Sequence, residues 1–97
     1  MLTLDECISK LAQFKAESAS KYGIARIGVF GSVARGEQTE RSDVDIVVVM
    51  DAPRLEAMHE LYTQLKGLFG RPVDVVRFRS SLDRSLMQDI ERDARYV

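Results

Sequence analysis

The strongest constraint on the fold is a run of β-branched residues near the middle of the chain. Residues 42–50 contain the stretch Val44-Asp45-Ile46-Val47-Val48-Val49, which is apolar except for one acid. A strand with one wet face alternates between apolar and polar residues, whereas a nearly continuous apolar run is typical of a strand covered on both faces. The chain must therefore supply other elements that pack on both sides of this strand.

The residues before this strand predict a helix and then a first strand. Apolar residues recur near the helical period over residues 4–22, with Thr3 and Glu6 at the spacing of a capping box and Gly23 at the end. Residues 24–30 are short, apolar and rich in β-branched side chains, as expected of a strand.

The second half predicts a helix, a third strand and a last helix. Pro53 suits a first helical turn, and the clearest amphipathic stripe of the chain follows over residues 55–69. Residues 73–78 form the third predicted strand, and residues 82–94 carry the apolar positions of a final helix. The expected fold is α/β (α+β), a mixed β-sheet with helices packed on it in the order α-β-β-α-β-α, with a short insert between the first two strands.

Composition excludes several classes of protein. Ninety-seven residues, 45% apolar and 30% charged, predict a single domain over residues 1–97. A net charge of −1 argues against direct nucleic-acid binding or attraction to an anionic membrane. The lone Cys7 excludes an internal disulfide, and neither a membrane-spanning run nor a signal peptide is recognisable, so a cytoplasmic location is expected.

A Gly-Ser turn follows the first predicted strand. Ser32 is placed to cap a very short helix that Gly36 closes, and Gly31 has no side chain to keep an anion away. Free backbone N–H groups at such a turn favour phosphate. The alternative is a capped turn without a ligand, because such turns are common.

Three acids accompany this turn. Asp43 and Asp45 are two residues apart on a strand, so their side chains point to the same face, where they suit Mg²⁺; the alternative is that both simply face water. Asp74 lies within the apolar third strand, which predicts a functional role. The alternative is that it pairs with an arginine or lies at an exposed strand edge.

The topology predicts that these groups meet. About ten residues separate Ser32 from Asp43, so neighbouring strands there run antiparallel, and the following helix makes the third strand parallel to the second. The turn and the three acids then share one edge of the sheet. The three carboxylates carry a charge of about −3, and a nucleoside triphosphate would add about −4. Two divalent cations and Arg35 would together supply about +5 to offset these negative charges.

The joined motif resembles the signature of the minimal nucleotidyltransferases, in the DNA polymerase β-like superfamily. It consists of Gly31-Ser32-x-Ala34-Arg35-Gly36 followed by Ser42-Asp43-x-Asp45. The element order and the later acid match along essentially the whole chain, so the resemblance implies the polymerase β-like nucleotidyltransferase fold.

The resemblance also implies roles for individual residues. Asp43 and Asp45 are expected to bind two Mg²⁺ ions, and Asp74 is expected to be the third carboxylate, which deprotonates the acceptor hydroxyl. Gly31 and Ser32 are expected to hold the triphosphate of ATP. Arg35 and Ser42 also match the motif, with phosphate-binding and structural roles both open.

The resemblance further implies a partner. Relatives of this size are typically paired with a HEPN-domain protein, usually a ribonuclease toxin, and act as its antitoxin. Those shown to be active transfer AMP from ATP to a tyrosine of that toxin. A homo-oligomer also remains open. The alternative function is a non-catalytic binding module that neutralises its partner by direct contact.

Overall fold

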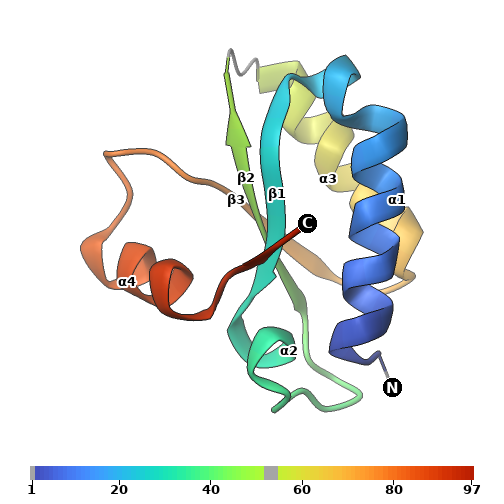
Figure 1. Ribbon diagram of the computed structural model, residues 1–97, viewed down its shortest axis with the longest axis vertical. Helices are drawn as coiled ribbons and strands as arrows, with labels where there is room; N and C mark the ends of the chain where they lie inside the picture. The colour runs from blue at the N-terminus through green and yellow to red at the C-terminus, as the bar shows by residue number, and fades with distance from the viewer. Residues whose placement is uncertain (1, 52–54) are drawn as a thin grey trace.

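The computed structural model describes residues 2–51 and 55–97, where helices flank a four-stranded sheet with strand order β3-β2-β1-β4 (Figure 1). The elements are α1 (Leu4–Tyr22), β1 (Ile24–Phe30), α2 (Gly31–Arg35), β2 (Val44–Met50), α3 (Leu55–Phe69), β3 (Val73–Arg77), α4 (Arg84–Asp93) and β4 (Arg95–Tyr96). The expected mixed α/β fold and its order are confirmed, with α2 inside the short insert. Strand β4 is an addition that the sequence pattern did not predict.

The strand directions are those expected from the connection lengths. β1 and β2 pair antiparallel, with Phe30 opposite Asp45, whereas β2 and β3 pair parallel, with Asp45 opposite Asp74. The end of β1 and the starts of β2 and β3 therefore lie at one edge of the sheet. The Gly31-Ser32 turn directly follows β1 and therefore lies at that same edge.

Helix boundaries follow from local capping. The Thr3 hydroxyl accepts a hydrogen bond from the Glu6 backbone N–H at 3.1 Å, which satisfies a free donor at the start of α1. Gly23 ends α1 in the left-handed conformation, with φ of 67°. Asp83 caps α4 by accepting from the Leu86 N–H at 3.2 Å.

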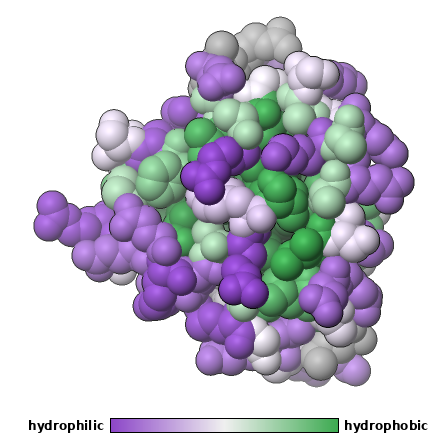
Figure 2. All heavy atoms as spheres, viewed as in Figure 1, coloured by the Kyte–Doolittle hydropathy of each residue, from purple (hydrophilic) through white to green (hydrophobic). Residues whose placement is uncertain are grey.

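Both faces of β2 are covered, as its apolar run predicted. Helices α1 and α3 pack on one face, where Ile46 and Val48 belong to the larger apolar cluster. Val47 points to the other face and joins Phe30 and Ile90 of α4 in a smaller cluster. All three β2 side chains are fully buried, and each contributes about 1.5–3 kcal/mol of hydrophobic free energy. In the view of Figure 2, apolar side chains gather in the middle of the molecule and polar ones surround them.

Some predicted details were wrong. β2 begins at Val44 rather than at residue 42, and β3 ends at Arg77 rather than at residue 78. Two members of the α3 stripe face solvent, since Leu55 is 86% and Tyr62 38% exposed. The predicted helical position of Pro53 lies outside the described residues. None of the helices within the described ranges is long and apolar enough to cross a membrane.

The additional strand β4 lies beside β1. It pairs antiparallel through Tyr96 opposite Gly28 and Arg95 opposite Val29. A Cβ atom at Gly28 would lie 2.6 Å from the Arg95 carbonyl oxygen, so a glycine is needed for this close approach. β4 comes directly after α4, so the pairing also fixes the end of α4 over the sheet.

Candidate active site

The centre of the predicted site is a pair of aspartates on neighbouring strands. Asp45 on β2 and Asp74 on β3 are register partners in the parallel ladder, so their side chains project from the same face. The residues two positions further on, Val47 and Val76, pack in the cluster beneath α4. Both carboxylates therefore lie on the α4 face of the sheet.

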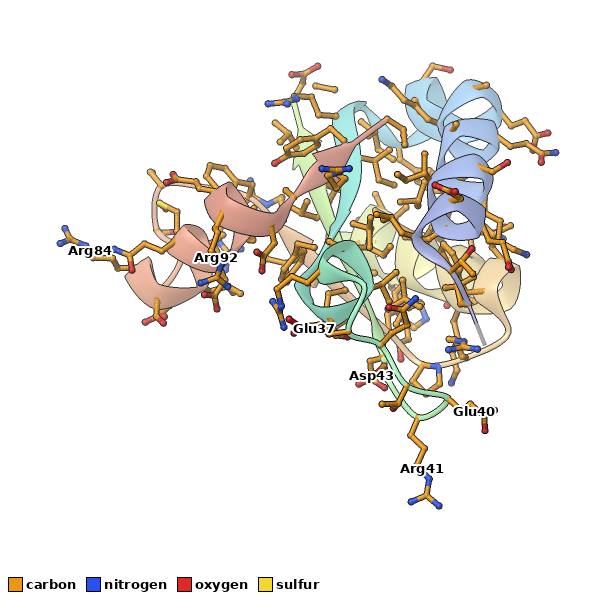
Figure 3. All side chains as sticks on the ribbon, turned by 60° about the horizontal axis from the view of Figure 1, so that its bottom comes forward. Glu37, Glu40, Arg41, Asp43, Arg84 and Arg92 are labelled. Carbon is orange, nitrogen blue, oxygen red and sulfur yellow. The ribbon has the colours of Figure 1, made fainter. Side chains whose placement is uncertain are left out.

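Asp43 lies where the loop after α2 enters β2. Figure 3 shows it close to the sheet, whereas Glu40 and Arg41 project from the loop into solvent. Asp43 and Asp74 are exposed, and Asp45 is partly buried. Burial raises the pKa of Asp45 to about 6, assisted by the negative charges of Asp74 and Asp43. Asp43 and Asp74 thus lie close enough to Asp45 for their charges to affect its ionisation, at the edge of the sheet that the topology predicted.

Gly31 places the Gly-Ser turn directly beside Asp45. Its φ is +70°, a conformation that other residues adopt only with strain, and a Cβ atom there would overlap the Asp45 carboxylate and lie 3.0 Å from Cγ. The predicted cap of α2 by Ser32 was wrong, because Phe30 is the N-cap and no side chain makes a capping bond. The strand turns into the helix at Gly31, so Ser32 is already inside the first turn. Gly36 closes α2 as predicted.

Ser42 makes structural hydrogen bonds. Its hydroxyl accepts from the Thr39 backbone N–H at 2.8 Å, and its own N–H donates to the Thr39 carbonyl at 3.1 Å. These bonds close the turn that delivers Asp43 to the edge of the sheet. A contact between Ser42 and phosphate stays a prediction.

Arg35 is held by two carboxylates. Its Nε donates to Glu37 at 3.1 Å and its Nη1 donates to Asp93 at 2.7 Å. Its positive charge also lowers the pKa of Asp45, although burial and the neighbouring acids outweigh this effect. Asp93 was missed by sequence reasoning, since it reads as one polar residue of an amphipathic helix. The only available signal was an acid in the last turn of that helix, where the helix dipole disfavours negative charge.

The donor chemistry of the site suits a divalent cation. Three carboxylates, two on adjacent strands and one just before β2, offer the hard oxygen ligands that Mg²⁺ prefers, and their mutual repulsion would be relieved by positive charge. As they stand, no three His, Cys, Asp or Glu side chains in residues 2–51 and 55–97 are gathered closely enough to enclose an ion. The assignment of Asp43, Asp45 and Asp74 as metal ligands therefore stays a prediction.

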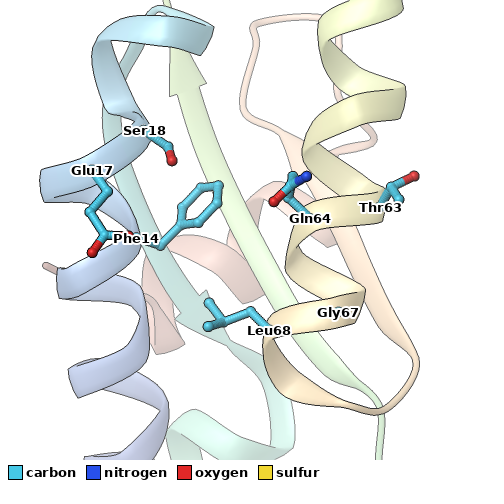
Figure 4. A pocket seen from close by; sticks show the side chains of 7 residues that line it. All are labelled: Phe14, Glu17, Ser18, Thr63, Gln64, Gly67 and Leu68. Carbon is cyan, nitrogen blue, oxygen red and sulfur yellow. The ribbon is translucent and has the colours of Figure 1, made fainter.

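A separate groove lies on the opposite face of the sheet. Figure 4 shows it between α1 and α3, and its lining residues are Phe14, Glu17, Ser18, Thr63, Gln64, Gly67 and Leu68. It contains none of the motif residues and no cluster of acids. The carboxylate edge beneath α4 is therefore the better candidate for chemistry.

Comparison with known proteins agrees with this geometry. Residues 11–97 match the family described as "Nucleotidyltransferase domain". The chain belongs to the nucleotidyltransferase family. The match includes β1, the Gly-Ser turn and all three acids.

Individual relatives of this nucleotidyltransferase are similar along most of its length. Protein adenylyltransferase MntA of Thermococcus cleftensis is 43% identical over 98 residues, covering 100% of this chain and 98% of the relative. A solved structure described as a candidate minimal nucleotidyltransferase is 32% identical with a TM-score of 0.79, covering 97% of this chain and 95% of that one. A chain in a crystal structure of a toxin–antitoxin with AMP-PNP is 27% identical with a TM-score of 0.73, covering 91% and 69%.

The contact between Gly31 and Asp45 predicts the effect of one methyl group. Gly31→Ala is expected to lower the unfolding free energy of the nucleotidyltransferase by about 1–3 kcal/mol from backbone strain. It is also expected to abolish activity, because the methyl group displaces the Asp45 carboxylate. Gly36→Ala is the matched control, since Gly36 has φ of +72° and open space around its Cβ position. Thermal melts and assays of nucleotidyl transfer should show that Gly36→Ala loses stability but keeps its activity. Equal activities of Gly31→Ala and Gly36→Ala would contradict the role of the contact between Gly31 and Asp45.

Proposed function

We propose that this protein transfers AMP from ATP, with Mg²⁺, to a tyrosine hydroxyl of a HEPN-type toxin and thereby acts as its antitoxin. The observation that carries the proposal is the register pair Asp45–Asp74 with Gly31 against it. It is supported by the name of the 43% identical relative, a protein adenylyltransferase, and by a similar chain that was solved in a toxin–antitoxin with AMP-PNP.

The proposed reaction assigns each residue a role. The acceptor oxygen forms a bond to the α-phosphorus, the bond between that phosphorus and pyrophosphate breaks, and pyrophosphate leaves with the electron pair. The acceptor proton passes to Asp74, whose exposure lets a side chain from another protein reach it. Asp43 and Asp45 would hold Mg²⁺, which when bound supplies positive charge to the phosphates and lowers the pKa of the acceptor hydroxyl. Gly31 and Ser32 orient the triphosphate.

The decisive experiment separates covalent modification from inhibition by contact. The HEPN-type partner is incubated with this protein, ATP and Mg²⁺, then repurified and examined by intact-mass spectrometry and by its ribonuclease activity. We expect one or more added AMP groups and lasting inactivation, because the added bulk and negative charge repel an RNA substrate.

The control uses Asp45→Asn protein under the same conditions. This variant should leave the partner unmodified and active after separation. If wild-type and variant protein neutralised equally well, and the repurified partner were unmodified and active, neutralisation by direct contact would replace the transferase proposal.

A further inference from the structure

Asp93 is a buried carboxylate that the reaction proposed above does not use. It is the last residue of α4, and its side chain is only 4% exposed. It accepts from Arg35 Nη1 at 2.7 Å, from Arg92 Nε at 2.9 Å and from Arg92 Nη2 at 3.0 Å. Two guanidinium groups, one on α2 and one on α4, therefore surround a single carboxylate. Figure 3 shows Arg92 at the end of α4 nearest α2, and Arg84 at the far end.

A charged carboxylate at the position of Asp93 would destabilise α4 if the helix were isolated. The C-terminal end of a helix carries a partial negative charge, which destabilises a carboxylate there, and burial disfavours any charge that lacks a partner. Hydrogen bonds from Arg92 lower the pKa of Asp93 to about 2, with a further contribution from Arg35, and together they outweigh the effect of burial. The ionised carboxylate is thus accounted for by its guanidinium partners, one of which comes from α2.

Helix α2 needs such a contact. It has only five residues, far fewer than an isolated helix requires, and no side chain caps its first turn. Val33 anchors one side of α2 in the core. Arg35 anchors the other side through its hydrogen bond to Asp93 at the end of α4. Movement of α2 would carry Gly31 and Ser32 away from the Asp45 carboxylate.

We propose that Asp93 is a positioning residue for nucleotide binding, which holds Arg35 and thereby holds the Gly31-Ser32 turn against the carboxylates of β2 and β3. The proposal rests on the proposed use of ATP. It gives Arg35 a role in the protein scaffold, because its guanidinium is turned toward α4. Without Asp93, Arg35 keeps only its exposed pair with Glu37, and a guanidinium that turned toward Asp45 would compete with a divalent cation.

The test measures the Kd for ATP in the presence of Mg²⁺ by isothermal titration calorimetry, which needs no partner protein. Asp93→Asn removes the charge and keeps the shape, and we expect it to raise the Kd by about 10- to 100-fold, as for other residues that orient binding groups. Asp89→Asn is the matched control. It makes the same change on the same helix, in a largely exposed pair with Arg92 at 3.3 Å, and should leave the Kd unchanged.

A double-mutant cycle with Arg35→Gln distinguishes positioning from general destabilisation. If Asp93 acts through Arg35, then adding Asp93→Asn to Arg35→Gln should change the Kd little further. If Asp93 only stabilises α4, the two effects should add, and that result would overturn the proposal. Thermal melts of every variant ensure that binding is measured on folded protein.

Two further results would also overturn the proposal. One is a wild-type Kd in folded Asp93→Asn, which would show that the carboxylate does not influence the turn. The other is a wild-type Kd in Arg35→Gln, which applies even if Asp93→Asn does not fold. Failure of the wild-type protein itself to bind ATP would instead contradict the proposed function, so the two failures are distinguishable.

Discussion

Asp45→Asn should abolish nucleotidyl transfer while making the protein more stable in the absence of divalent cations. Asparagine keeps the size of the side chain and removes the charge that Asp43 and Asp74 repel. The lost carboxylate is also the one that a Cβ atom at Gly31 would meet, so it lies directly beside the Gly31-Ser32 turn. Transfer of labelled AMP to the partner measures the first effect, and chemical unfolding in the presence of a chelator measures the second.

The gain in stability has a predicted pH dependence. The pKa of Asp45 is about 6 in the fold, above its ordinary value of 3.8, so the folded state binds this proton more tightly than the unfolded chain. The unfolding free energy of wild-type protein should therefore rise as the pH falls from about 7 to about 4. We expect a rise of about 1–2 kcal/mol, less than the full shift implies because the carboxylate is partly exposed. Asp45→Asn should lack this rise and be more stable by a similar amount at pH 7.

The other carboxylate with a shifted pKa, Asp93, affects stability only at lower pH. Asp93 has a lowered pKa of about 2, so its stabilisation of the fold is complete above its ordinary pKa and is lost only as the pH falls toward 2.

Asp51→Asn is the matched control for Asp45→Asn, because it makes the same change at an exposed position just beyond the other end of β2. Near wild-type transfer by Asp45→Asn would show that the two-metal interpretation of the site is wrong.

Asp74→Asn should separate binding from chemistry. Asp43 and Asp45 remain in this variant, so ATP with Mg²⁺ should bind with an affinity close to that of wild type. The rate of transfer should fall by about 10²–10⁴-fold if the acceptor hydroxyl loses its proposed general base. The exposure of Asp74 at the edge of β3 supports this role, since an acceptor on another protein can reach it.

Calorimetry and single-turnover kinetics of the same protein preparation measure both quantities. The result that would contradict the assignment is loss of ATP binding in Asp74→Asn. Asp74 would then be a principal ligand or a structural residue rather than a base. Unchanged transfer would exclude both roles.

The local sequence pattern was sufficient for most of the fold. The apolar run of β2, the Thr3 cap and the Gly23 stop are short-range features, and each occurs in the structure where the pattern placed it. Connection lengths then determined strand directions, since a short insert requires an antiparallel neighbour and a helical crossover permits a parallel one. Those directions place Asp45 and Asp74 at one edge of the sheet, and the register of β2 and β3 makes them direct partners.

Other features depended on contacts between distant parts of the chain. β4 has two residues and no periodicity, so only its pairing with β1 defines it as a strand. The sharp turn at Gly31, rather than a hydroxyl cap, begins α2.

The pairing of Arg35 with Asp93 joins residues 58 positions apart, and nothing in the pattern of either segment marks one as the partner of the other. The sequence by itself therefore determined the strands, their directions and the acids at their ends, because these follow from periodicity and chain length. Only the tertiary structure decided how α2 is held against those acids. That contact depends on the distance between two charged groups after the sheet and α4 have come together.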